Sequence, residues 1–149
     1  MAVDEDVLAS LEREVTVLLR RAERVRLGAA ERAGSSLDRS GYLLLLQLSE
    51  LGPVGVTALA QRLALDASTI TRQVARLVES GLVIREPDQE DRRAVRHRLT
   101  PAGRRELRTL RRARRELFAE LLEDWSEDER AQFSRLLVRF NEALSRHER

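Results

Sequence analysis

Hydroxyl and guanidinium side chains gather on one side of a predicted helix near the middle of the chain, between Asp66 and Gly81. On a helical wheel of about 100° per residue, they lie roughly opposite an apolar stripe. The polar set is Ser68, Thr69, Arg72 and Arg76, and the stripe is Ile70, Val74 and Leu77. Hydroxyls at the start of an exposed helix can bond to base edges in a DNA major groove, and Arg72 can make a paired contact to guanine. An ordinary amphipathic helix with a solvated polar face would show the same pattern.

The segment before Gly81 predicts two short helices joined by a tight turn. Leu59 and Leu63 of the first helix continue the apolar side of the second. Asp66 stands where the second helix needs an oxygen to cap its free N–H groups. Gly81 stands just past its end, where the backbone must turn left-handed. This is the pattern of a helix-turn-helix.

A predicted β-hairpin follows this motif directly, in the position of a wing. Residues 82–87 and 95–99 are short and β-prone, and they flank a polar segment. In the second of them, Val95, His97 and Leu99 alternate with arginines, which gives the strand an inner and an outer face.

The charges of this hairpin balance. Residues 86–98 contain four acids and four arginines, so the segment cannot bind DNA as a diffuse basic patch. Asp91 can fold back on Arg93 and fix the hairpin tip. Arg92 or Arg93 then enters a minor groove, where a narrow A·T tract attracts guanidinium groups; a purely structural pair between Asp91 and Arg93 explains the same spacing. Arg96, on the outer face of the second strand, is a further predicted DNA contact.

Residues 91–103, Asp-Arg-Arg-Ala-Val-Arg-His-Arg-Leu-Thr-Pro-Ala-Gly, resemble the wing signature of the multiple antibiotic resistance regulator (MarR) family. The resemblance extends over nearly the whole chain. It implies that Asp91 and Arg93 are the family's paired wing acid and wing-tip arginine. The proline that usually follows the first wing acid is absent, because Gln89 follows Asp88.

The resemblance also carries functional expectations. It places four side chains of the predicted second helix at the major groove: Ser68, Thr69, Thr71 and Arg72. It implies a repressor of transcription that is often released from DNA by a small aromatic or phenolic effector, bound between the dimer helices and the winged segment. Tyr42 and Trp125 are aromatic residues with a polar edge, and they can line such a cleft. The alternative is that both are core or dimer-interface residues, which implies no effector site.

The terminal segments predict long helices whose apolar stripes have no partner in the middle of the chain. A second copy would cover them, with the terminal helices interleaving about a two-fold axis; a monomeric helical bundle is the alternative. The side chains predicted at the interface of this homodimer are Leu8, Leu11, Val15, Trp125, Phe133, Leu137 and Phe140. Two helix starts are marked by caps: Thr100 before Pro101, and Ser126 with Glu129 as a capping box.

Together these elements predict a mainly α fold with a small β wing (α+β), a winged helix-turn-helix whose long N- and C-terminal helices form a dimerisation region. The predicted organisation is one domain over residues 1–149, with dimerisation helices 1–34 and 126–149, a winged DNA-binding segment 54–100 and a connecting helix 101–125. A nearly all-apolar helix, about residues 40–51, should lie at its centre, and residues 54–56 can add a short strand beside the wing.

Composition narrows the function classes. The chain has no cysteine, which excludes disulfides, thiolate metal sites and thiol redox sensing. His97 and His147 are isolated, and no phosphate loop or catalytic cluster is present, so we predict neither an enzyme nor a cofactor or metal site. The longest wholly apolar-aromatic run, residues 42–46, falls far short of the ~20 that span a membrane, and no leader is recognisable, so we predict a cytoplasmic protein.

Charge is segregated along the predicted helix after the wing. Residues 104–115 hold seven arginines against Glu106, and residues 116–129 hold seven acids and no base. The arginine block lies at a helix N-terminus, where the helix dipole disfavours positive charge. Acids from a partner subunit or from the first helix can offset this cost, and so can DNA phosphate near the helix start.

The function predicted from these patterns is sequence-specific binding of double-stranded DNA at pseudo-palindromic operators. A winged helix used for protein–protein contact or assembly, without specific DNA binding, is the alternative. The outward hydroxyl and guanidinium groups of the helix-turn-helix, together with the wing arginines, favour DNA.

Overall fold

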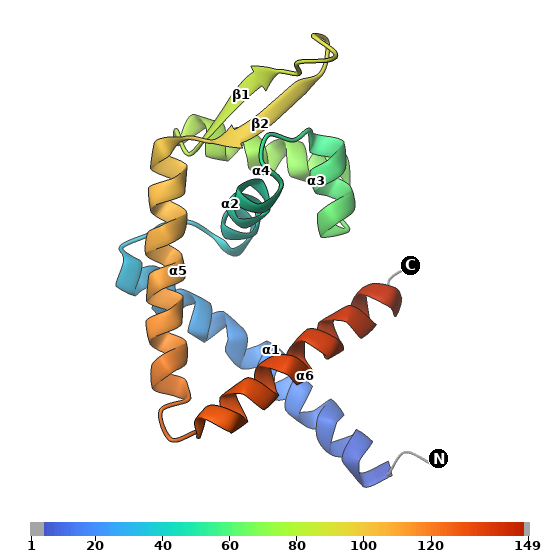
Figure 1. The fold of residues 1–149 in the computed structure, drawn as a ribbon, viewed down its shortest axis with the longest axis vertical. Helices are drawn as coiled ribbons and strands as arrows, with labels where there is room; N and C mark the ends of the chain where they lie inside the picture. The colour runs from blue at the N-terminus through green and yellow to red at the C-terminus, as the bar shows by residue number, and fades with distance from the viewer. Residues whose placement is uncertain (1–4, 148–149) are drawn as a thin grey trace. The chain divides into compact units, whose positions relative to one another are not determined.

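The computed structural model describes residues 5–147. They form six helices and a two-stranded antiparallel sheet, in two compact units that divide after Arg114, within α5 (Figure 1). The first unit contains α1 (Glu5–Ala33), α2 (Arg39–Leu51), α3 (Val56–Leu63), α4 (Ala67–Glu79), β1 (Val83–Pro87), β2 (Val95–Leu99) and most of α5 (Pro101–Leu121). The second contains the end of α5 and α6 (Glu127–His147). The predicted mainly helical fold with a β wing is confirmed.

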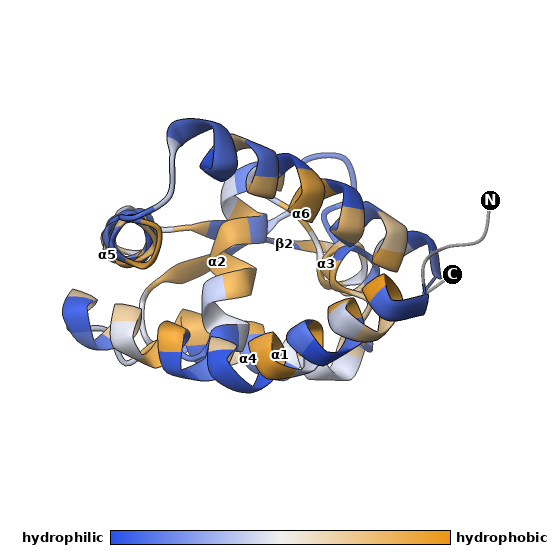
Figure 2. Cartoon of the chain, turned by 90° about the horizontal axis from the view of Figure 1, so that it is seen from below, coloured by the Kyte–Doolittle hydropathy of each residue, from blue (hydrophilic) through white to orange (hydrophobic). Residues whose placement is uncertain are grey.

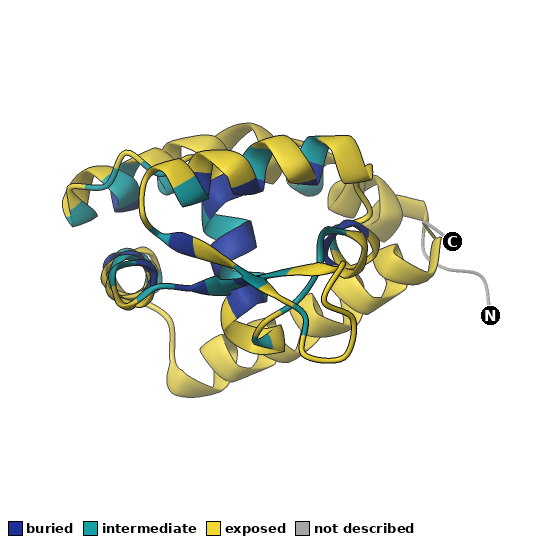
Figure 3. Cartoon of the chain, turned by 90° about the horizontal axis from the view of Figure 1, so that it is seen from above, coloured by how far each residue is buried: buried dark blue, intermediate teal, exposed yellow. Residues whose placement is uncertain are grey.

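Helix α2 is the centre of the core of the first unit. It begins behind Asp38, whose carboxylate accepts a hydrogen bond from the Gly41 N–H at 2.7 Å. Leu44, Leu45 and Leu48 are buried, as the apolar run predicts, and Figure 3 shows the buried residues gathered in the middle of the view. Burying each such leucine contributes about 1.5–3 kcal/mol relative to leaving it exposed, so α2 anchors the elements packed on it.

Helices α3 and α4 form the predicted helix-turn-helix. Leu59 of α3 and Ile70 and Val74 of α4 join the same core, with at most 1% of each residue exposed. Ala64 makes the turn between the helices in the left-handed region, with φ 52°, a conformation that costs a non-glycine residue roughly 1–2 kcal/mol. Gly81 follows α4 with φ 74°, as its place in the sequence predicts.

The wing pairs β1 with β2 from Val83 opposite Leu99 to Pro87 opposite Val95. His97 and Leu99 are buried, as the alternation predicts. Val95 is 48% exposed although it shares their predicted inner face, because it lies at the far end of the hairpin, beyond the core.

Beside the wing, Val54 makes a single bridge to β2. Its N–H donates to the His97 carbonyl oxygen at 3.1 Å, and its carbonyl oxygen accepts the His97 N–H at 2.8 Å. Helix α3 already begins at Val56, which leaves no length for a strand. The predicted strand over residues 54–56 is therefore wrong in extent.

Helix α5 is fixed to the base of the wing by its first turn. The Thr100 hydroxyl accepts a hydrogen bond from the Gly103 N–H at 3.0 Å and donates one to the Gly81 carbonyl oxygen at 2.6 Å. Gly103 lies directly against the backbone of Leu82, since a Cβ at this position would be 2.0 Å from the Leu82 carbonyl oxygen. The predicted Thr-Pro helix start is confirmed, and the glycine two residues after the proline permits the close approach.

In the second unit, α6 begins with the predicted capping box. The Ser126 N–H donates to Glu129 Oε2 at 2.7 Å, and the Ser126 hydroxyl accepts the Glu129 N–H at 3.2 Å. Helix α5 ends at Leu121, before the predicted end at residue 125, so Trp125 lies in the turn between the helices. Its ring meets Phe133 edge to face, with centroids 5.4 Å apart.

The terminal helices expose their apolar side chains. No residue over the described length of α6 is buried, and it is coloured as exposed throughout in Figure 3. Phe133, Leu137 and Phe140 are 40–45% exposed, and on α1 Leu8 and Leu11 are 50–55% exposed. These stripes have the spacing of a buried helix face, but residues 5–147 leave them exposed.

We expect Gly103→Ala to destabilise the protein. The added Cβ would overlap the Leu82 carbonyl oxygen, a backbone atom that cannot rotate away, so the loss should reach or exceed the ~1–3 kcal/mol typical of overpacking. Urea unfolding followed by circular dichroism measures it. Gly28→Ala is the matched control, because nothing lies within 4 Å of its added Cβ; it should be neutral or stabilising. Unchanged stability of the Gly103 variant would contradict the close approach.

Candidate nucleic-acid interface

Helix α4 begins with a carboxylate that holds its first turn together. Asp66 Oδ1 accepts the Thr69 N–H at 2.8 Å, and the two carboxylate oxygens accept the hydroxyls of Ser68 at 2.5 Å and Thr69 at 2.6 Å. The Ser68 hydroxyl, followed by the Thr69 groups, holds the pKa of Asp66 far below its usual range. The predicted cap is confirmed. The hydroxyl protons of Ser68 and Thr69, which we expected to point to DNA, are used within the helix start.

The outward face of α4 carries the remaining predicted contacts. Thr71, Arg72 and Arg76 are exposed. The Thr71 hydroxyl donates to the Ala67 carbonyl oxygen at 2.7 Å. The two guanidinium groups form no ion pair within residues 5–147, so all their donors are available to a ligand. Ala75, a small residue beside them on the helix, is also exposed.

The tip of the wing is organised by Asp88, a residue that sequence reasoning assigned no role. Its Oδ1 accepts the N–H groups of Glu90 at 2.8 Å and Asp91 at 3.1 Å, and these bonds, that of Asp91 first, lower the pKa of Asp88. Asp91 accepts the backbone N–H of Arg93 at 3.0 Å. Asp91 thus folds back on Arg93 through the main chain, and the Arg93 side chain stays outside the contact.

The wing arginines divide into two groups. Arg96 forms an ion pair with Asp88, and Arg98 Nε donates to Glu86 Oε2 at 2.6 Å across the hairpin. In the described part of the chain, Arg92 and Arg93 form no ion pair. Arg96, predicted as a DNA contact, is therefore engaged inside the wing, and the two tip arginines remain available.

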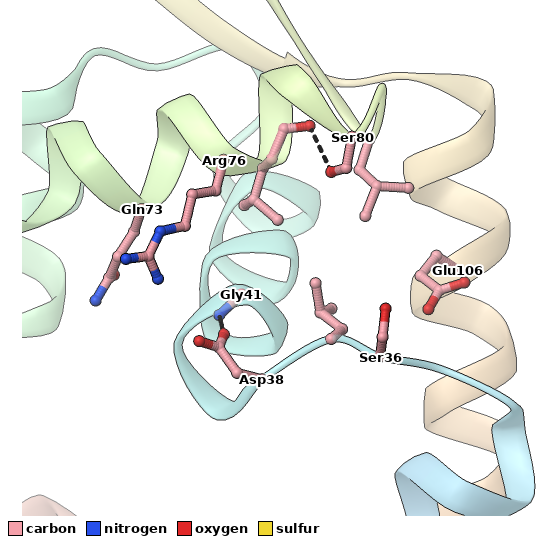
Figure 4. Close-up of a pocket in the computed structure, with 10 residues that line it drawn as sticks. Ser36, Asp38, Gly41, Gln73, Arg76, Ser80 and Glu106 are labelled. Carbon is pink, nitrogen blue, oxygen red and sulfur yellow. Dashed lines mark hydrogen bonds between the residues drawn. The ribbon is translucent and has the colours of Figure 1, made fainter.

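A cavity of about 270 Å³ lies among the start of α2, the second half of α4 and the first turns of α5 (Figure 4). Gln73 and Arg76 enter it from α4, and Glu106 enters from α5 on the other side. The Ser35 hydroxyl, in the loop before α2, donates to Glu106 Oε1 and ties that loop to α5. Leu37, Leu77 and Leu82 form the apolar part of the cavity wall, and Asp38 and two serines add further polar groups.

The two aromatic residues predicted to line an effector cleft occupy different places. Tyr42 does not line this cavity; its ring carries the Arg114 guanidinium, 4.3 Å from the ring centroid, in a cation–π contact. Trp125 belongs to the second unit and packs on Phe133.

Comparison with known proteins shows to which family this chain belongs. The model of the MarR family matches residues 37–95. The uncharacterized HTH-type transcriptional regulator YxaD of Bacillus subtilis is 39% identical over 134 residues, covering 90% of this chain and 92% of that protein. The chain belongs to the MarR family. This confirms the resemblance seen in the wing residues, and it makes the protein a DNA-binding regulator of transcription with a winged helix-turn-helix.

Solved structures of MarR-family proteins share the fold. A MarR family protein from Bacillus stearothermophilus superposes with a TM-score of 0.85 at 26% identity, over 97% of this chain and 99% of that one. The PcaV regulator of Streptomyces coelicolor, solved in complex with its natural ligand, superposes with a TM-score of 0.69 at 28% identity, over 97% of this chain and 99% of that one.

Two further findings concern other kinds of site. Over residues 5–147, none of the helices combines the length and apolar character needed to cross a membrane. The same residues contain no group of three or more His, Cys, Asp or Glu side chains placed to hold a metal ion.

A buried histidine lies at the base of the MarR-type wing. His97 is 2% exposed, and neither ring nitrogen has a hydrogen-bond partner within the described residues. Burial and then the charge of Arg85, its cross-strand neighbour, lower the pKa of His97. The ring is therefore held neutral, and protonation would place an unpaired charge beside a guanidinium group.

Acidification should weaken the fold through His97. The pKa of His97 is lower in the folded chain than in the unfolded chain, where it is about 6.5. The stability that depends on a neutral His97 ring is therefore intact above pH 6.5, and it is lost as the pH falls below that value. Urea unfolding at about pH 7.5 and about pH 5.5 should show a larger loss for the natural protein than for His97→Val, which cannot titrate. Equal losses would show that His97 is not the group responsible.

Proposed function

We propose that two copies of this chain bind a pseudo-palindromic operator and thereby repress transcription. Each α4 enters a major groove, with half-sites about 10 base pairs apart. The observation that carries the proposal is a pair of exposed arginines, Arg72 and Arg76, that form no ion pair within residues 5–147. They lie on a recognition helix whose opposite face is buried in the core. A dimer seated on such an operator excludes other proteins from the same DNA.

The two arginines of α4 contact different parts of the DNA. Arg72 lies near the helix start, which enters the groove first, and its planar fork matches the two acceptors of guanine. Arg76, one turn later, meets a phosphate. Ser68 and Thr69 act here through the Asp66 cap, with their oxygen lone pairs left as acceptors, while the Thr71 methyl group faces the bases.

The wing supplies the second contact of each subunit. Arg92 and Arg93 enter the neighbouring minor groove, since Arg96 is engaged with Asp88 and keeps the hairpin in shape. The backbone bond between Asp91 and Arg93 holds the tip without neutralising the arginine.

Dimerisation follows from the apolar stripes of the terminal helices. Interleaved α1 and α6 helices of two subunits would bury Leu8, Leu11, Val15, Phe133, Leu137 and Phe140, with Trp125 beside them. An isologous interface of this kind places two recognition helices symmetrically, as a two-fold operator requires.

The cavity beside α4 supports control by a small molecule. Arg76 is at once a wall of that cavity and the proposed phosphate contact. A small aromatic or phenolic effector that engages Arg76 there would draw it away from DNA. PcaV, a protein of the same fold that was solved in complex with its natural ligand, supports the proposal that this fold can hold a small molecule.

Arg72→Ala should weaken binding to an operator fragment selected with the natural protein by about 1–3 kcal/mol, roughly 5- to 150-fold in Kd, and relax the preference at one base pair. Fluorescence anisotropy with all four bases at each half-site position measures both effects. Arg146→Ala removes the same charge from the last turn of α6 and should bind as the natural protein does. Retained affinity and base preference in the Arg72 variant would refute the contact.

Absence of duplex binding by the natural protein at low salt would instead favour a protein-contact role.

Phe140→Asp should convert the dimer into monomers. The change removes a side chain worth about 1.5–3 kcal/mol of burial from each subunit and adds a carboxylate to an apolar interface. Light scattering with size-exclusion chromatography gives the mass. Val138→Asp is the control, because Val138 is equally apolar and 54% exposed but lies well away from Phe140 around the helix. A monomeric natural protein, or a dimeric Phe140 variant, would rule out this interface.

A further inference from the structure

Helix α5 carries a ridge of exposed arginines that neither the recognition helix nor the wing uses. The arginine ridge consists of Arg104, Arg105, Arg108 and Arg111, all exposed. At about 100° per residue they occupy some 120° of the helix circumference, on the side away from the buried Gly103 and Leu110. Figure 2 views α5 nearly end-on and shows its hydrophilic and hydrophobic residues on different sides.

The described part of the chain provides no acid that compensates the charge of the ridge. Glu106 is the one acid between Pro101 and Arg115. It points into the cavity and accepts the Ser35 hydroxyl, so it does not reach the ridge. Within residues 5–147, Arg105, Arg108 and Arg111 pair with no carboxylate.

Electrostatics makes this arrangement unfavourable in the isolated chain. Arg104 and Arg108 are like charges one turn apart, and Arg108 and Arg111 are similarly close. Arg104 and Arg105 also lie in the first turns of α5, where the helix dipole disfavours cations. A bound polyanion would remove both penalties together.

The ridge is held rigidly beside the wing. Arg104 Nη1 donates to the Leu99 carbonyl oxygen at 3.1 Å, at the end of β2. Thr100 and Gly103 tie the same turn to the backbone of Gly81 and Leu82. Positive charge on α5 therefore continues directly from the base of the DNA-binding wing.

We propose that the arginine ridge binds phosphates of the duplex that flanks each half-site, outside the base pairs that α4 contacts. This inference rests on the proposed operator binding. The ridge is about 10 Å long, which matches about three phosphates along one strand, and guanidinium forks suit phosphate oxygens. The ridge adds sequence-independent attraction to that of Arg92 and Arg93, since the other two wing arginines, Arg96 and Arg98, are neutralised by Asp88 and Glu86.

The test compares two duplexes and two charge-matched variants. The duplexes are a selected operator trimmed to its footprint and the same operator extended by about ten base pairs at each end. The ridge variant is Arg105→Gln, Arg108→Gln and Arg111→Gln, which leaves the Arg104 bond to Leu99 intact. The control variant removes three exposed arginines of α1: Arg20→Gln, Arg21→Gln and Arg24→Gln. Circular dichroism and light scattering establish that both variants keep the helical content and the mass of the natural protein.

The measured quantity is the slope of log Kd against log salt concentration. For the natural protein, the slope should be steeper on the extended duplex than on the trimmed one, by about 0.9 for each flanking phosphate contact. The ridge variant should lose this difference and bind the trimmed duplex as the natural protein does, while the control variant should keep it.

Three results would overturn the proposal: a ridge variant that keeps the full difference, a control variant that loses as much, and a ridge variant whose slope falls equally on both duplexes. A ridge variant that keeps the full difference would indicate that the ridge binds an acidic protein surface. A slope that falls equally on both duplexes would indicate that the ridge contacts phosphates inside the half-sites. Failure of the natural protein to bind either duplex would count against operator binding itself, and is thereby distinguished from failure of the ridge.

Discussion

Burial of Ile70, Val74 and Leu77 against the leucines of α2 sets the rotation of α4 about its own axis. Side chains recur around a helix at a fixed angle, so the same packing turns Arg72 and Arg76 outward. A change that loosened this contact would move the guanidinium groups without touching them. The recognition surface thus depends on an apolar interface that never meets DNA.

Acidic side chains give this basic interface its shape. Asp66 holds the first turn of α4, Asp88 folds the wing tip, and Glu86 pairs with an arginine across the hairpin. The surface ion pairs that Glu86 and Asp88 make with Arg98 and Arg96 contribute little to stability, but they restrict where the remaining positive charge can act. Among the described residues, Arg92 and Arg93 at the wing tip have no such partner, which is why a hairpin with balanced charge can still present cations to a groove.

Much of the architecture was predictable because its signals are local. A cap must stand immediately before the helix that it serves, so Asp66, Thr100 and Ser126 could be recognised from their neighbours alone, and their hydrogen bonds are as expected. Apolar periodicity likewise predicted α4 and the buried character of α2. The left-handed Ala64 was not predictable, because alanine carries no sign of a turn and its conformation is imposed by the packing of α3 against α4.

By itself, the sequence determined the order of the elements, their caps, the family to which the chain belongs and the set of arginines from which DNA contacts are drawn. The tertiary structure decided which of those arginines are free. Arg96 meets Asp88 only when the hairpin closes, and Gly103 meets Leu82 only when α5 docks at the wing. Burial leaves the ring of His97 without a hydrogen-bond partner among the residues that the structure describes. These outcomes depend on groups that the folded backbone brings together from different elements, whereas periodicity and caps depend on near neighbours in the chain.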